Sequence, residues 1–103
     1  MKRTREEVMR AIQDNLGALR RFGVRRLGLF GSCVRDEATE ASDLDFVVDL
    51  ERETFDAYMD VKEFLEELFG CPVDLVMTDT IKPRLRETIM RETIYVEGLQ
   101  ALP

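Results

Sequence analysis

The stretch LGLFGSCVRDEATEASDLDFVVDL, from Leu27 to Leu50, decides the fold. One hydrophobic run ends at Gly31-Ser32, and a second begins at Asp43-Leu44-Asp45. Side chains two residues apart on a strand point to the same side of a sheet. We therefore expect a strand, a turn of small residues, and a second strand whose start presents Asp43 and Asp45 side by side.

The two carboxylates predict a site for a divalent cation. Magnesium prefers oxygen ligands and is usually held by one or two carboxylates together with substrate phosphates. Gly31 permits close approach of a phosphate to the backbone and Ser32 adds a hydroxyl, while a helix from Ser32 to about residue 36 would add free N–H groups. Arg35, three residues after Ser32, would lie on the same face of that helix and neutralise phosphate charge. A salt bridge to Asp36, Glu37 or Glu40 explains Arg35 equally well.

The pattern Gly31-Ser32-x-x-Arg35, followed by Ser42-Asp43-x-Asp45 and a hydrophobic run, resembles the signature of the DNA polymerase β-type nucleotidyltransferase superfamily. The layout is similar to its minimal nucleotidyltransferases (MNT proteins), which are commonly antitoxins encoded beside a helical HEPN toxin. The resemblance extends from about residue 8 to residue 96. It implies an α/β (α+β) fold with a small mixed sheet and helices mainly on one face, in a single domain over residues 1–103. Asp36-Glu37, where many relatives have Gly, departs from the pattern in a variable turn.

The superfamily needs a third carboxylate on a later strand, and Asp74 within CPVDLVM, residues 71–77, fits this role. Without the upstream motif, Asp74 would be read as an ordinary solvent-facing strand residue. The resemblance implies that two magnesium ions are held by Asp43, Asp45 and Asp74, which act in transfer of a nucleotide from ATP to a hydroxyl. The nucleotide-binding turns would be formed by Gly31, Ser32, Arg35 and Ser42.

Periodicity and capping signals predict the remaining elements. Thr4 and Glu7 form a capping box for a helix that runs to about residue 22, with Val8, Ile12, Leu16 and Leu19 on its apolar face. Strands are expected at 24–30, 43–50 and 72–77, and a helix capped by Thr54 is expected to end at Gly70. A last helix from Pro83 to about 93 would turn Leu85, Ile89 and Met90 inward, before a short edge strand at 93–97 and a frayed tail from residue 98. The face of the sheet that carries the acids would remain open as a cleft.

Composition excludes several classes of protein. With 45% hydrophobic and 35% charged residues, the chain fits a small soluble domain of the cytoplasm, and we expect neither a secretory signal nor a membrane span. The absence of His excludes a Ser-His-Asp triad, a Cys-His pair and the usual His-containing zinc sites. Two cysteines make no disulfide framework. A net charge of −6 argues against duplex nucleic-acid binding and favours a protein partner, particularly a basic one.

Three functions remain open from the sequence. The chain could transfer AMP to a HEPN-type toxin and silence it, or neutralise such a toxin by binding alone. It could also modify a small molecule, as aminoglycoside nucleotidyltransferases do, although these enzymes usually carry a further substrate-binding domain. The intact set Gly31, Ser32, Asp43, Asp45 and Asp74 favours an active enzyme, because a pure binding module has no chemical need for three acids.

Overall fold

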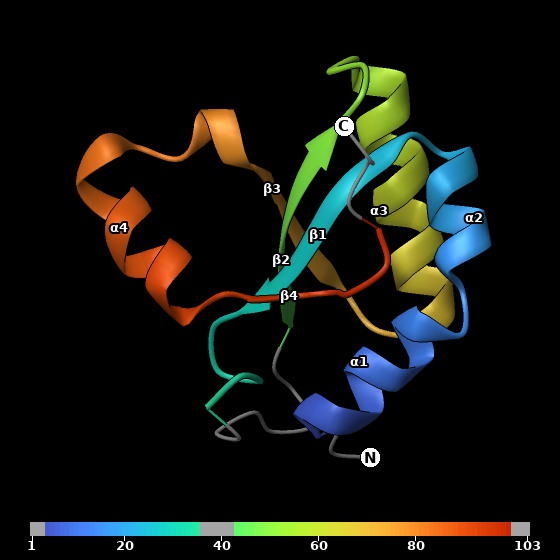
Figure 1. The fold of residues 1–103 in the computed structure, drawn as a ribbon, viewed down its shortest axis with the longest axis horizontal. Helices are drawn as coiled ribbons and strands as arrows, with labels where there is room; N and C mark the ends of the chain where they lie inside the picture. The colour runs from blue at the N-terminus through green and yellow to red at the C-terminus, as the bar shows by residue number, and fades with distance from the viewer. Residues whose placement is uncertain (1–3, 36–42, 100–103) are drawn as a thin grey trace.

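The computed structural model describes residues 4–35 and 43–99, which form four α-helices and one four-stranded sheet (Figure 1). In chain order the elements are α1 (Arg5–Gln13), α2 (Leu16–Arg21), β1 (Val24–Phe30), β2 (Leu44–Leu50), α3 (Phe55–Phe69), β3 (Val73–Met77), the short 3-10 helix η1 (Thr78–Thr80), α4 (Pro83–Glu92) and β4 (Ile94–Tyr95). The strand order is β3-β2-β1-β4. Strands β2 and β3 are parallel, whereas β1 is antiparallel to both β2 and β4. The predicted mixed sheet is confirmed.

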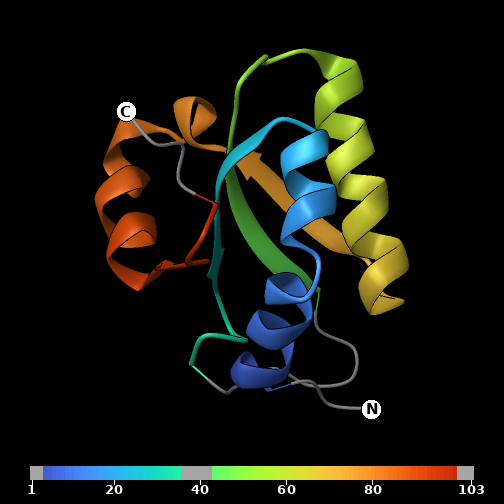
Figure 2. The same ribbon diagram turned by 45° about the vertical axis from the view of Figure 1, so that its right-hand side comes forward.

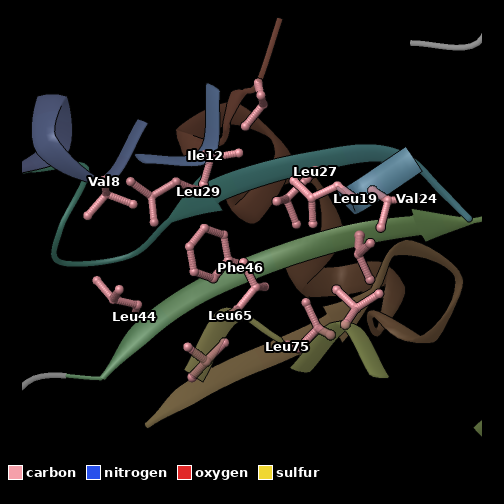
Figure 3. Packing of buried hydrophobic residues seen from close by; sticks show 14 of the residues in the cluster. Val8, Ile12, Leu19, Val24, Leu27, Leu29, Leu44, Phe46, Leu65 and Leu75 are labelled. Atoms are coloured by element: carbon pink, nitrogen blue, oxygen red, sulfur yellow. The ribbon is translucent and has the colours of Figure 1, made fainter. Parts of the chain in front are cut away.

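Three helices cover one face of the sheet. In Figure 2, α1, α2 and α3 lie on one side and α4 lies on the other. The main core lies between the sheet and the three helices, and Figure 3 shows Phe46 of β2 amid its aliphatic side chains. The rings of Phe46 and Phe69 stack with their centroids 6.0 Å apart. Because Phe46 faces this core, its neighbour Asp45 belongs to the opposite face of the sheet.

The predicted helix termini are confirmed at three positions. The Thr4 hydroxyl accepts a hydrogen bond from the Glu7 N–H at 3.1 Å and donates to the Glu7 carboxylate at 3.2 Å. The Thr54 hydroxyl accepts from the Ala57 N–H at 3.1 Å at the start of α3. Gly70 ends α3 in the left-handed conformation, with φ of 65°.

The predicted single N-terminal helix is wrong, because the chain breaks it into α1 and α2 around Asp14-Asn15. The Asn15 side chain donates to the Ala11 carbonyl at 2.7 Å, so it competes with the backbone for an acceptor. Short polar side chains of this kind favour helix ends over helix interiors. The break still leaves Val8, Ile12 and Leu19 fully buried on one side.

The prediction that α4 turns Leu85, Ile89 and Met90 inward is wrong for Leu85, which is 47% exposed. No residue of α4 is fully buried, and Ile89 and Met90 are only partly covered. Helical periodicity identifies an apolar stripe but not a surface to cover it. In the part of the chain that the structure describes, no helix is both long and apolar enough to cross a membrane.

The expected frayed tail is also wrong where the structure describes it, because Leu99 is only 3% exposed. The Gln13 side chain donates to the Glu97 carbonyl at 3.0 Å, and Arg20 donates to the Gly98 carbonyl. These bonds fasten the segment after β4 to α1 and α2. The rest of the predicted tail, 100–103, lies outside the described residues.

Candidate active site

Two of the predicted acids lie next to each other on parallel strands. In the register of β2 and β3, Asp45 is the direct partner of Asp74. Neighbouring strands are about 4.8 Å apart, so the two carboxyl groups project side by side from the same face of the sheet. Asp43 is exposed and immediately precedes β2, whereas the sequence predicted it as the first residue of that strand.

The pKa of Asp45 is raised to about 6. Partial burial is the largest cause, followed by the negative charge of Asp74, a hydrogen bond between the two carboxyl groups, and the charge of Asp43. The positive charge of Arg35 lowers the pKa in part. The charges of both other acids and of the predicted phosphate-binding arginine therefore all act on the pKa of Asp45.

Gly31 makes room for Asp45. Its φ is +81°, a conformation that side-chain-bearing residues rarely adopt, and a Cβ added there would overlap Asp45 Oδ2. Phe30, which precedes Gly31, is the direct β1 partner of Asp45. Asp45 on β2 thus lies between the Gly-Ser turn that follows β1 on one side and Asp74 of β3 on the other.

The segment from Ser32 to Arg35 forms a hydrogen-bonded turn, so the predicted one or two helical turns are not present there. The Val34 N–H donates to the Gly31 carbonyl at 3.2 Å, and Arg5 of α1 donates to the Val34 carbonyl at 3.3 Å. Cys33 is buried in the core and fixes the turn to the body of the fold. The backbone could still offer N–H groups to a phosphate, but without the dipole of a helix N-terminus.

Arg35 forms an ion pair with Glu92 at the end of α4, with Nη1 and Oε1 2.5 Å apart. No pattern in the sequence pointed to Glu92, because it lies 57 positions from Arg35. The acidic alternatives Asp36, Glu37 and Glu40 lie outside the described residues, as does the predicted site residue Ser42. The structure thus places Gly31, Ser32, Arg35, Asp43, Asp45 and Asp74 at one end of the sheet.

The part of the sequence that forms this end of the sheet matches a known protein family. The sequence matches the family described as nucleotidyltransferase domain over residues 12–96, a span that includes all the predicted site residues. The chain belongs to the nucleotidyltransferase family. Its four-stranded mixed sheet and the order of its helices agree with that assignment.

Relatives of this nucleotidyltransferase cover nearly the whole chain. The protein adenylyltransferase MntA of Thermococcus cleftensis is 43% identical over 95 residues, a match that spans 90% of this chain and 96% of that protein. A solved structure assigned as a minimal nucleotidyltransferase is 40% identical, with a TM-score of 0.75 over 85% of this chain and 92% of that one. A toxin-antitoxin crystal structure with AMP-PNP shares the fold at 22% identity, with a TM-score of 0.70 over 89% of this chain and 74% of that one.

The donor set of this nucleotidyltransferase suits a hard cation, because all three acids offer carboxylate oxygens. Among residues 4–35 and 43–99, however, no three His, Cys, Asp or Glu side chains lie close enough together to hold a metal ion. Asp45 and Asp74 are paired by register, whereas Asp43 lies ahead of the strand. The magnesium site therefore stays a prediction that the chemistry of the acids supports.

Proposed function

We propose that this chain is a magnesium-dependent protein adenylyltransferase. It would move AMP from ATP to a hydroxyl side chain of a helical HEPN-type toxin and so act as an antitoxin. The observation that carries the proposal is the placement of Asp45 between Asp74 on β3 and the Gly31 turn at the end of β1. This order supplies an acceptor side and a phosphate side around one carboxylate.

The residues could divide the reaction between them. The turn from Gly31 to Arg35 would hold the β- and γ-phosphates, with Arg35 exchanging its pairing with Glu92 for phosphate oxygens. An acceptor hydroxyl oxygen at Asp74 would attack the α-phosphorus, the bond to the β-phosphate oxygen would break, and pyrophosphate would leave. The proton of the hydroxyl would pass to the neighbouring Asp45, whose pKa is raised to about 6 and therefore suits proton transfer near neutral pH. Bound magnesium would screen the triphosphate charge and make the acceptor hydroxyl more acidic.

The name of one relative supports a protein as the acceptor of the AMP group. The MntA relative is named for transfer of an adenylyl group to protein, and its match spans 90% of this chain. The partner class follows from the resemblance to MNT proteins, and a toxin-antitoxin structure with AMP-PNP shares the fold. The chain itself is acidic, with a net charge of −6, so a partner with a basic docking surface would associate favourably.

The proposal is tested by incubating the purified chain with magnesium and α-labelled ATP, with and without a HEPN-type partner. The mass of the intact partner is then measured by mass spectrometry. We expect a mass increase of one or more AMP units. The Asp43→Asn, Asp45→Asn double variant should lose the transfer and still bind the partner. Equal neutralisation of the toxin by both forms, with no mass change, would establish the alternative, an antitoxin that acts by binding alone.

A further inference from the structure

A separate pocket of about 470 Å³ lies beside β3, on the strand that carries Asp74. Phe55 and Tyr58 of α3 form one wall, and Val76, Met77 and Thr80 form the other. The volume falls within the usual range of about 300–1,000 Å³ for sites that take a ligand or side chain. β3 is an edge strand of the sheet, and the pocket lies at this edge, where it borders the main core at Leu75.

The polar groups of the pocket are already paired within the chain. The Tyr58 hydroxyl donates to the Leu75 carbonyl at 2.6 Å, and the Thr80 hydroxyl donates to the Met77 carbonyl at 2.8 Å. The Thr54 hydroxyl accepts the helix-capping bond of α3. The surface left for an occupant is therefore mainly apolar, and Phe55 at its rim is 75% exposed, the most exposed of the large hydrophobic side chains described.

An acidic pair marks the same rim. The carboxyl groups of Glu53 and Asp79 share a hydrogen bond, and their mutual repulsion, with a smaller effect of Asp49, raises the pKa of Glu53. Carboxyl groups held this close are stabilised by a nearby cation. The rim is thus complementary to a positively charged side chain.

The pocket also lies on the acceptor side of the site. Val76 follows Asp74 by two residues on the same strand, so the two residues are about 7 Å apart and point to the same face. The phosphate turn lies beyond β2, at the end of β1. The other pocket residues lie at the carboxyl end of β3 and the start of α3, so a polypeptide seated there would extend along β3 to reach Asp74 near the strand's amino end.

We propose that this pocket docks the protein substrate, and that it takes an apolar or aromatic side chain whose neighbour in the substrate is Lys or Arg. This inference rests on the proposed function and adds a recognition rule to it. The apolar side chain would cover Phe55 and Tyr58, while the basic neighbour would pair with Glu53 and Asp79.

Binding is tested directly with blocked dipeptide amides, followed by two-dimensional NMR of the whole chain. Phe-Arg amide should shift the signals of Phe55, Tyr58 and Val76. Ala-Arg amide and Phe-Glu amide should bind at least about tenfold more weakly, because each lacks one of the two contacts. Equal binding of all three dipeptides, or shifts centred away from the pocket, would overturn the proposal.

Transfer kinetics with the HEPN-type partner provide the second test. Phe55→Ala should raise KM for the partner roughly tenfold, as loss of an interface anchor does, with kcat and KM for ATP unchanged. Leu85→Ala is the matched control, since among residues 4–35 and 43–99 Leu85 is the other exposed large hydrophobic residue, and it lies on α4. Identical kinetics for the two variants would refute the docking role. If the wild-type chain transfers no AMP, the proposed function fails, and the dipeptide experiment alone decides whether the pocket takes apolar-basic segments.

Discussion

Replacing Asp45 with Asn should stabilise the nucleotide-free protein above pH 6. In the folded chain the pKa of Asp45 is raised from 3.8 to about 6, whereas the unfolded chain restores the ordinary value. Between these two pH values the folded state binds more protons than the unfolded state, so the stability of the wild type falls as pH rises. Above pH 6 both states are ionised and the loss is complete. The Asn variant carries no such charge and avoids the loss.

The size of the effect follows from the same shift. A displacement of two pKa units corresponds to about 3 kcal/mol for a fully buried group. Asp45 is only partly buried, so solvent screening reduces this to about 1–2 kcal/mol. For a domain of this size, that difference raises Tm by roughly 5–10 °C at pH 8 and by nearly nothing at pH 4.

The assay is urea and thermal unfolding of both proteins from pH 4 to pH 8, in EDTA so that no cation offsets the repulsion. Asp49→Asn is the matched control, because Asp49 lies on the same strand and face but forms an ion pair with Arg26 at 2.7 Å. It should lower stability at pH 7 by up to about 1 kcal/mol, opposite in sign to the Asp45 variant. If Asp45→Asn is no more stable than wild type at pH 8, the inferred crowding of carboxylates at Asp45 is wrong.

Three further outcomes can be measured. Gly31→Ala and Gly23→Ala should each cost about 1–2 kcal/mol in unfolding experiments, because both glycines have φ above +80°. Only Gly31→Ala should also cut AMP transfer by tenfold or more, because the added Cβ would displace the Asp45 carboxylate. A Cβ added at Gly23 would meet nothing closer than 3.9 Å, so equal activity of the two variants would contradict this reasoning. Asp74→Asn should retain ATP binding by calorimetry and lower the transfer rate by about a hundredfold, whereas wild-type turnover would make Asp74 a surface residue. Glu92→Gln should bind ATP about threefold more tightly, because the partly exposed ion pair between Glu92 and Arg35 competes with phosphate and is worth under about 1 kcal/mol. Weaker binding would instead show that Glu92 positions the Arg35 guanidinium for the nucleotide.

Local chemistry made much of the fold predictable. Thr54 and Gly70 are capping residues whose preference depends only on the first and last turns of α3. The two hydrophobic runs were enough to locate β1 and, to within one residue, β2. The exposed position of Leu85 was not predictable, because an apolar stripe indicates a helix without indicating what packs against it.

The candidate site depends on longer-range relations. The pairing of Asp45 with Asp74 is a matter of register between strands separated by α3, and only family resemblance pointed to Asp74. The ion pair between Arg35 and Glu92 had no signal in the sequence. Gly31 was expected to serve a phosphate, and its close packing against Asp45 became evident only from the structure.

The attachment of the chain's late residues to its first helices has a consequence for synthesis. Val96 and Leu99 complete a core that begins with Val8, and the hydrogen bond from Gln13 to Glu97 spans 84 positions. Such distant contacts form late and slow the folding of a small domain. The core of a nascent chain can therefore close only after Leu99 has emerged from the ribosome, so the arrangement of the acids also forms only after that point.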